Sequence, residues 1–176
     1  RLERQFRLLS AHPEICWSSG AYERLRLDQG ERRHVGASMI SDRVRAQGDG
    51  IFHALQAMAQ GTSVWTGTLL VKKTALDAVG GFPENLRGGE DTDLWIRLAL
   101  KYPDFAFVTN TIAQYLVAQG TSLTRENTAT IEPWRYDQLC RLQAYCRDSS
   151  DDANHEFLIS MLHQKIDGFT NGLLRQ

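Results

Sequence analysis

The chain has few cysteines and no excess of charge of either sign. Its three cysteines among 176 residues include no Cys-x-x-Cys pair, which excludes a disulfide framework and indicates a reducing compartment. We expect Cys16, Cys140 and Cys146 to be small buried residues. The formal net charge of -1 argues against a nucleic-acid or anionic-membrane partner. No segment approaches the run of about 18 apolar residues that a membrane-spanning helix needs.

Several motifs of catalysis and metal binding are also missing. The chain has no Gly-x-Ser-x-Gly elbow, no P-loop and no Gly-x-Gly-x-x-Gly. Its five histidines show neither His-Glu-x-x-His nor the Cys/His spacing of a zinc site. These residues therefore predict no metal site, and a zinc or hydrolytic enzyme is disfavoured.

What the chain does contain, a mixture of helices and short strands, predicts an α/β or α+β protein. Helical periodicity and capping residues indicate helices at 2–9, 51–59 (capped by Asp49), 74–79, 90–101, 133–146 and 151–166. Apolar and β-branched runs indicate strands at 15–17, 22–27, 63–71, 105–108 and 112–117. Residues 28–48 are predicted to form an irregular loop and residues 120–130 a linker. The first helix starts without a cap, so we expect a segment upstream of it.

One stretch carries most of the chemical information, Gly80 to Glu84 followed by Gly88 to Leu98. Acidic residues crowd the first turn of the helix at 90–101, where the helix dipole favours negative charge. Asp91 also lies on the stripe of Leu94, Trp95 and Leu98, so its carboxylate should point into a cleft at the edge of the core. Such a carboxylate can act as a general base, although simple complementation of the helix terminus is the alternative. Asp93 and Arg97 are spaced to form an i,i+4 pair.

The order of these motifs resembles the family 2 glycosyltransferases of the GT-A fold. The chain has Thr66-Gly67-Thr68, then Gly80-Gly81-Phe82-Pro83-Glu84, then Glu90-Asp91-Thr92-Asp93-Leu94-Trp95-Ile96-Arg97. The opening helix, with Leu2-Glu3-Arg4-Gln5, is similar to the helix that follows the family's metal-binding Asp-x-Asp. The resemblance covers residues 1–124, and residues 125–176 form a helical C-terminal extension. It implies the C-terminal part of a GT-A (Rossmann-like) domain with a short mixed sheet.

The resemblance implies transfer of a sugar from a nucleotide-sugar donor to a hydroxyl acceptor, with inversion at the anomeric carbon. Asp91 would be the catalytic base and Glu90 would line the acceptor site. Thr66 and Gly67 would lie near the donor sugar. Trp65 either stacks on a sugar face or serves as a core aromatic. Gly81 and Phe82 would shape the turn beside the site.

The chain also departs from the family pattern. The Asp-x-Asp and the nucleotide-binding half are absent, so we expect a fragment that is inactive alone. Leu116 and Ala118 stand where many members have the Arg and His of Tyr-Arg-x-His, and that His can ligate the metal. A divalent cation, Mn²⁺ or Mg²⁺, is therefore expected in the full-length enzyme, with ligands mostly outside this chain.

The partners implied are a nucleotide-sugar donor and a glycan, lipid-linked or other hydroxyl acceptor. The expected location is the cytoplasm or the inner face of a membrane. The alternative is a non-catalytic interaction module, in which the helices at 133–147 and 151–167 pack on a partner or form a homodimer. The mass of the protein at several concentrations discriminates the two.

Overall fold

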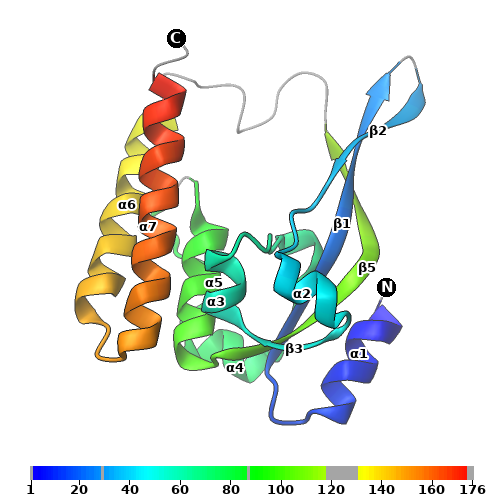
Figure 1. Ribbon diagram of the computed structural model, residues 1–176, viewed down its shortest axis with the longest axis horizontal. Coiled ribbons are helices and arrows are strands. Elements are labelled where there is room, and N and C mark those ends of the chain that lie inside the picture. The colour runs from blue at the N-terminus through cyan, green and yellow to red at the C-terminus, as the bar shows by residue number, and fades with distance from the viewer. Residues whose placement is uncertain (1, 29, 87, 118–130, 174–176) are drawn as a thin grey trace.

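The computed structural model describes residues 2–28, 30–86, 88–117 and 131–173 and forms an α/β fold around one mixed sheet (Figure 1). The strands are β1 (Trp17–Asp28), β2 (Glu31–Ala37), β3 (Gly50–His53), β4 (Leu70–Val71) and β5 (Asp104–Val117). The helices are α1 (Leu2–Ala11), α2 (Asp42–Gln47), α3 (Ala54–Ala59), α4 (Lys73–Ala78), α5 (Glu90–Lys101), α6 (Ile131–Asp148) and α7 (Asp152–Leu173), with a 3₁₀ turn, η1, at Thr66–Thr68. The prediction of an α/β fold with a short mixed sheet and a helical C-terminal region is confirmed.

Strand β5 lies at the centre of the sheet, whose order is β2-β1-β5-β3 with β4 paired to β1. It runs parallel to β1 and antiparallel to β3. The register of β1 against β5 shifts between Gly20 and Tyr22, where Gly20 pairs with Val108 and Tyr22 with Ala113. The two strands predicted at 105–108 and 112–117 are therefore one strand with an irregularity in its middle.

The two faces of the sheet bury different kinds of side chain. Trp17, Phe105 and Phe107 belong to the large hydrophobic core on one face, and their rings pack in series with centroids 4.9 and 5.8 Å apart. The opposite face carries small residues under α1, such as Ser18 and Ala106. Because small side chains occupy little space, α1 can approach β1 and β5 closely there.

The helices on the aromatic face share one core with the C-terminal pair. Helices α6 and α7 lie side by side next to α5 and α3 in Figure 1. Leu142 of α6 and Leu158 of α7 are fully buried against this core. The division at residues 1–124 and 125–176 stays a prediction, since its boundary and the linker at 120–130 fall outside the described residues.

The prediction of an irregular loop over 28–48 is wrong. The segment contains β2, which forms an antiparallel hairpin with β1, and helix α2, which Ser41 caps through its side-chain oxygen. Nearly every side chain of β2 is exposed. Backbone hydrogen bonds to β1 therefore hold β2 in place. Because β2 lacks the alternation of buried apolar residues by which a half-buried strand is recognised, its sequence does not indicate a strand.

The helix predicted at 51–59 and the strand predicted at 63–71 are each only partly correct. Ile51 and Phe52 pair with Ala106 and Phe105 as β3, so the helix starts only at Ala54. Asp49 is not its cap. Instead, the Asp49 carboxylate accepts hydrogen bonds from the backbone N–H and the hydroxyl of Thr109, at 2.8 and 2.9 Å.

Between residues 63 and 71, η1 and the two-residue β4 replace the expected strand. The chain turns there because the backbone N–H of Thr68 donates to the Trp65 carbonyl at 2.9 Å and closes the 3₁₀ turn, and the Thr68 hydroxyl donates to the same carbonyl at 2.9 Å.

Two smaller expectations also change. Helix α4 begins at Lys73 rather than at residue 74, and its N-cap, Lys72, makes no side-chain capping bond. Of the three free thiols, Cys146 is buried, Cys16 is half-buried and Cys140 is exposed. Cys140 is therefore not the buried residue that we predicted, because it lies on the face of α6 turned away from the core.

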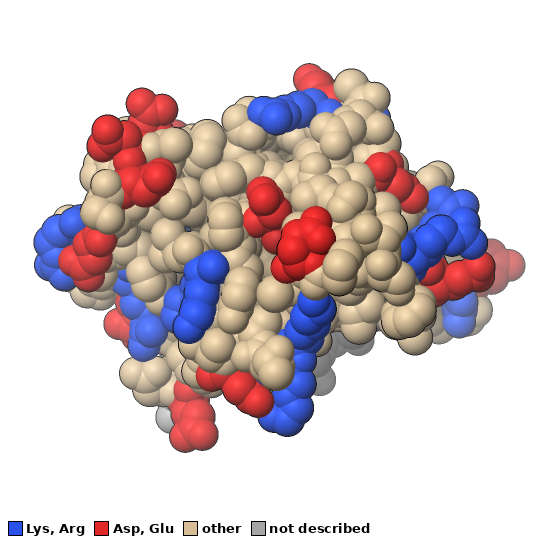
Figure 2. Space-filling view, turned by 90° about the horizontal axis from the view of Figure 1, so that it is seen from below, with Lys and Arg blue, Asp and Glu red and all other residues tan. Residues whose placement is uncertain are grey.

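Surface charge is mixed on the face shown in Figure 2, where acidic and basic side chains alternate among the described residues. Within the described ranges, no helix combines the length and the apolar character that crossing a bilayer requires.

Candidate functional site

The first turn of α5 presents an acidic side chain that is only half-buried. Gly89, at the N-cap, has φ 75°, a left-handed conformation that glycine adopts without steric cost. Two residues further on, Asp91 Oδ1 accepts hydrogen bonds from the Thr92 backbone N–H at 2.6 Å and the Thr92 hydroxyl at 3.3 Å. Asp91 Oδ2 has no hydrogen-bond partner among the described residues. One oxygen is thus fixed and the other is available to a ligand.

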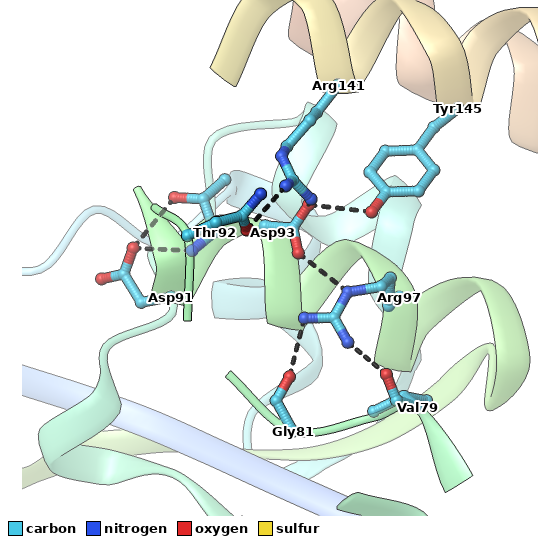
Figure 3. A network of polar contacts seen from close by, with 9 residues as sticks. Val79, Gly81, Asp91, Thr92, Asp93, Arg97, Arg141 and Tyr145 are labelled. Carbon is cyan, nitrogen blue, oxygen red and sulfur yellow. Dashed lines mark hydrogen bonds and ion pairs between the residues drawn. The ribbon is translucent and has the colours of Figure 1, made fainter. Parts of the chain in front are cut away.

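Asp93, in contrast, is buried and fully engaged. It is 3% exposed, and its Oδ2 accepts from Arg97 Nε at 2.8 Å. Its Oδ1 accepts from the Tyr145 hydroxyl at 2.8 Å and lies 3.4 Å from Arg141 Nη1 (Figure 3). The predicted pair with Arg97 is confirmed, but it is part of a buried network rather than a solvated surface pair.

The same network holds the turn at Gly80–Gly81 against α5. Arg97 donates through Nη2 to the Gly81 carbonyl at 2.8 Å and through Nη1 to the Val79 carbonyl. Gly81 has φ 63°, so the turn needs glycine at this position. Phe82, next to it, is 43% exposed. Gly81 and Phe82 therefore shape a turn that lies on the Asp93 side of the helix.

In Figure 3 the Asp91 carboxylate points away from the Asp93 network. The two aspartates of the Glu-Asp-x-Asp run thus have different surroundings. The buried Asp93 joins α5 to α6, whereas the half-buried Asp91 faces the other side of the helix end. Glu90, between Gly89 and Asp91, is also half-buried.

An aromatic cluster lies at the junction of β1, η1 and β5. The Trp65 ring lies 4.9 Å from Tyr22 and 5.2 Å from Tyr115 between centroids, the latter edge-on. A Cβ at Gly67 would overlap the Trp65 ring, so glycine there lets the indole fold over the backbone. Trp65 is half-buried, and Thr66 beside it is exposed. The sugar-stacking role of Trp65 stays a prediction.

Tyr22 connects this aromatic cluster to Asp91. Burial raises the pKa of the Tyr22 hydroxyl, while the Ser63 side chain and the Arg24 charge lower it. The negative charge of Asp91 also raises the pKa, as the weakest of these influences. Tyr22 was not among the sequence-predicted site residues, because an isolated tyrosine on a strand has no motif.

A groove of about 370 Å³ opens beside the start of α5, and we call it the α5–α7 groove. It lies between β1, the segment after α3, α5 and α7. Asp91 does not line the groove itself, but Thr92, which donates to Asp91 Oδ1, does. Residues from all four elements line it, including Tyr22, Ser63, Thr92, Trp95, Met161 and Gln164.

Within the described ranges, no three His, Cys, Asp or Glu side chains gather in a way that could hold a metal ion. The divalent cation that the resemblance implies, with ligands expected mostly outside this chain, stays a prediction. Ala118, at the position of the family's histidine, lies outside the described residues.

Comparison with known families points to the same part of the chain. A family model described as the N-terminal domain of galactosyltransferase matches residues 50–119. The match includes β3, α5, β5 and both aspartates of the α5 terminus. It supports a glycosyltransferase domain and, in general terms, sugar transfer between a nucleotide-sugar donor and an acceptor. The comparison with curated proteins finds no match.

The structure brings some predicted residues together and separates others. Trp65 and Gly67 lie in the aromatic cluster with Tyr22, which links them to Asp91. Gly81 and Phe82 lie with the Asp93 network instead. The contribution of α7 to the groove could not be predicted, because a contact between residues about a hundred positions apart leaves no local pattern.

Proposed function

We propose that the protein transfers a sugar from a nucleotide-sugar donor to a hydroxyl acceptor with inversion, and that Asp91 is the general base. The observation that carries the proposal is the half-fixed carboxylate. Thr92 holds Oδ1, and Oδ2 is without a partner among the described residues beside a groove. The match to a galactosyltransferase family model over this segment supports the reaction class.

In this mechanism the acceptor hydroxyl attacks the anomeric carbon on the face opposite the nucleotide diphosphate. A carbon–oxygen bond forms to the acceptor while the bond to the diphosphate breaks, and the hydroxyl proton passes to Asp91 Oδ2. Because Thr92 already fixes Oδ1, the carboxylate loses less conformational freedom when it reaches the reactive geometry. Glu90 and Trp65 are proposed to contact the substrates at the edge of the site.

Asp93 is unsuited to the role of base. Both of its oxygens accept hydrogen bonds from cationic or phenolic donors, and its side chain is almost entirely removed from solvent. Neither oxygen of Asp93 is therefore free to receive the proton of an acceptor hydroxyl. We therefore propose that Asp91 acts as the base and that Asp93 serves only the buried network.

The experiment compares Asp91→Asn with the wild-type protein at its full natural length. We expect kcat to fall by about 10² to 10⁴, the usual contribution of a general base, with little change in the melting temperature. Glu84→Gln is the matched control, because Glu84 is an exposed acid of the same region. Near-normal turnover of the Asp91→Asn protein would contradict the proposal.

Assignment to family 2 and to the GT-A fold, and the role of a divalent cation, are proposed on the resemblance of the motifs. The expectation that this chain alone does not bind a nucleotide sugar productively stays a prediction.

A further inference from the structure

Beyond the reaction itself, the α5–α7 groove has the features of a binding site for a small polar ligand. Its volume of about 370 Å³ lies at the lower end of the range of about 300 to 1,000 Å³ typical of small-molecule sites. A volume of this size suits one sugar ring better than a long chain. Thr92 lines the groove and donates to Asp91 Oδ1, so a ligand within the groove can place a hydroxyl near the proposed base.

The lining of the groove combines two kinds of surface. Trp95 and Met161 supply apolar area, which suits the C–H face of a pyranose ring. Ser63, Thr92 and Gln164 supply hydroxyl and amide groups, which suit its hydroxyls. A lipid chain would leave these polar groups without partners, at a cost in binding free energy.

Helix α7 lines the groove with Gln164, whose amide nitrogen is held in a fixed orientation. Gln164 donates from Nε2 to the Ala59 carbonyl at 2.6 Å, and Nε2 lies 3.4 Å from Ser160 Oγ. Its Oε1 has no hydrogen-bond partner among the described residues, and an amide oxygen readily accepts from a sugar hydroxyl.

Trp95 supplies an independent indication of a ligand. It is 8% exposed and lines the groove, yet its indole Nε1 has no hydrogen-bond partner within the described ranges. A buried donor without a partner is uncommon in proteins, and bound water or a ligand often accounts for it.

We propose that the α5–α7 groove binds the acceptor as a single pyranose unit of a glycan, and that Gln164 of α7 helps to select it. This inference rests on the proposed function for the position of the reacting hydroxyl. It adds the chemical class of the acceptor and gives the C-terminal helix a part in specificity.

The test measures binding of methyl glycosides of glucose, galactose, mannose and N-acetylglucosamine to the full-length protein by saturation-transfer NMR. We expect at least one glycoside to bind. Gln164→Trp fills the groove from an exposed helix position and should weaken that binding more than tenfold, an effect of steric exclusion. Gln164→Leu removes only the polar group and should weaken it by about two- to tenfold.

The matched control is His163→Trp, because His163 is the exposed neighbour of Gln164 and is not among the groove residues. This variant should bind like the wild type. The inference is overturned if no glycoside binds, if Gln164→Trp binds normally, or if His163→Trp loses binding equally. Circular dichroism of each variant shows that a loss does not come from unfolding.

The Asp91→Asn variant separates this inference from the proposed function. Binding of the glycoside should persist within about twofold in that variant, since a general base acts on the proton and contributes little to ground-state binding. Normal turnover of Asp91→Asn together with lost binding in Gln164→Trp would overturn the base and leave the pocket. Lost turnover of Asp91→Asn together with normal binding in Gln164→Trp would overturn the groove as the acceptor site and leave Asp91 as the base.

Discussion

Asp91 and Asp93 are two residues apart, but they belong to different parts of the molecule. Asp91 is held by a single neighbour, whereas Asp93 receives donors from Arg97 on its own helix and from Arg141 and Tyr145 on α6. Removal of a partner from a buried ion pair leaves an uncompensated charge in a region of low dielectric. Substitutions at the two positions should therefore affect different properties.

We expect Asp93→Ala to lower the free energy of unfolding by about 3 to 5 kcal/mol, because it leaves the Arg97 guanidinium without its buried counter-ion. Asp91→Ala should change stability by less than about 1 kcal/mol, since it removes only a local bond to Thr92. Urea unfolding followed by circular dichroism measures both. Equal losses at the two positions would show that the Asp93 network does not carry the stability assigned to it.

Tyr145 gives the same network a dependence on pH. Burial, and secondarily the bond to Asp93, raise the pKa of the Tyr145 hydroxyl from 10.0 to about 12. The folded state thus binds this proton more tightly than the unfolded state. The stability that the protonated Tyr145 hydroxyl contributes is fully present below about pH 10 and is lost as the pH rises through about 12.

We therefore expect wild-type protein to lose more stability than Tyr145→Phe between pH 9 and pH 12, in the window set by this pKa. At neutral pH the variant should be less stable by about 1 to 3 kcal/mol, because Asp93 loses a donor. Unfolding free energies at several pH values provide the comparison. A difference between the two proteins that stays constant up to pH 12 would rule out Tyr145 as the titrating group.

At the scale of the elements, helix α1 is attached to the sheet by a buried polar side chain. Gln5 is fully buried, and its Nε2 donates to the Thr68 carbonyl at 2.7 Å and to Ser18 Oγ at 3.1 Å. These bonds join α1 to β1 and η1 at once. The nearby exposed residues of the helix, Leu2 and Phe6, contribute little burial.

Gln5→Leu keeps the volume of the side chain and removes both bonds, so it should destabilise the protein by about 1 to 3 kcal/mol. Thermal unfolding should show a lower melting temperature, by about 2 to 4 °C for each kcal/mol in a protein of this size. Ser10→Ala on the same helix is the control, because Ser10 is exposed. An unchanged melting temperature for Gln5→Leu would mean that apolar contacts alone hold α1.

The elements that could be predicted from the sequence are those whose signals are local. Helix α5 was predicted with its observed bounds, because glycine precedes it, acids crowd its first turn and its apolar stripe is regular. Strand β3 could not be separated from α3, because Ile51 and Phe52 continue the helical spacing. Only their pairing with Phe105 and Ala106 makes them a strand.

The candidate site was predictable to the same extent. Asp91 could be singled out because its own helix carries the buried stripe of Leu94, Trp95 and Leu98. The burial of Asp93 in a network could not be predicted, because it depends on Tyr145 and Arg141 from a distant helix. Tyr22 and Gln164 reach the groove through tertiary packing, which leaves no pattern in the surrounding sequence.

At the scale of the whole molecule, the C-terminal helices use their apolar faces internally. Leu158 and Met161 of α7, with Leu142 of α6, are buried in the chain's own core. We therefore expect light scattering after size exclusion to give a monomer mass at all concentrations, because stable homodimers need a large additional apolar surface. A concentration-dependent dimer would instead favour the alternative, a non-catalytic interaction module. Ile166 is exposed on α7, so loss of such a dimer in an Ile166→Ser variant would place the dimer interface on α7.

The parallel pairing of β1 with β5 sets the order in which the protein can form. Gly20 and Val108 are neighbours in the sheet but lie about ninety residues apart in the chain. During synthesis at about 5 to 20 residues per second, β1 and β2 can close their hairpin early, and one edge of β1 then stays open for roughly ten seconds. An open edge invites pairing with other chains. The nascent protein is thus most prone to association just before its central strand emerges, and β5 protects it by inserting between β1 and β3.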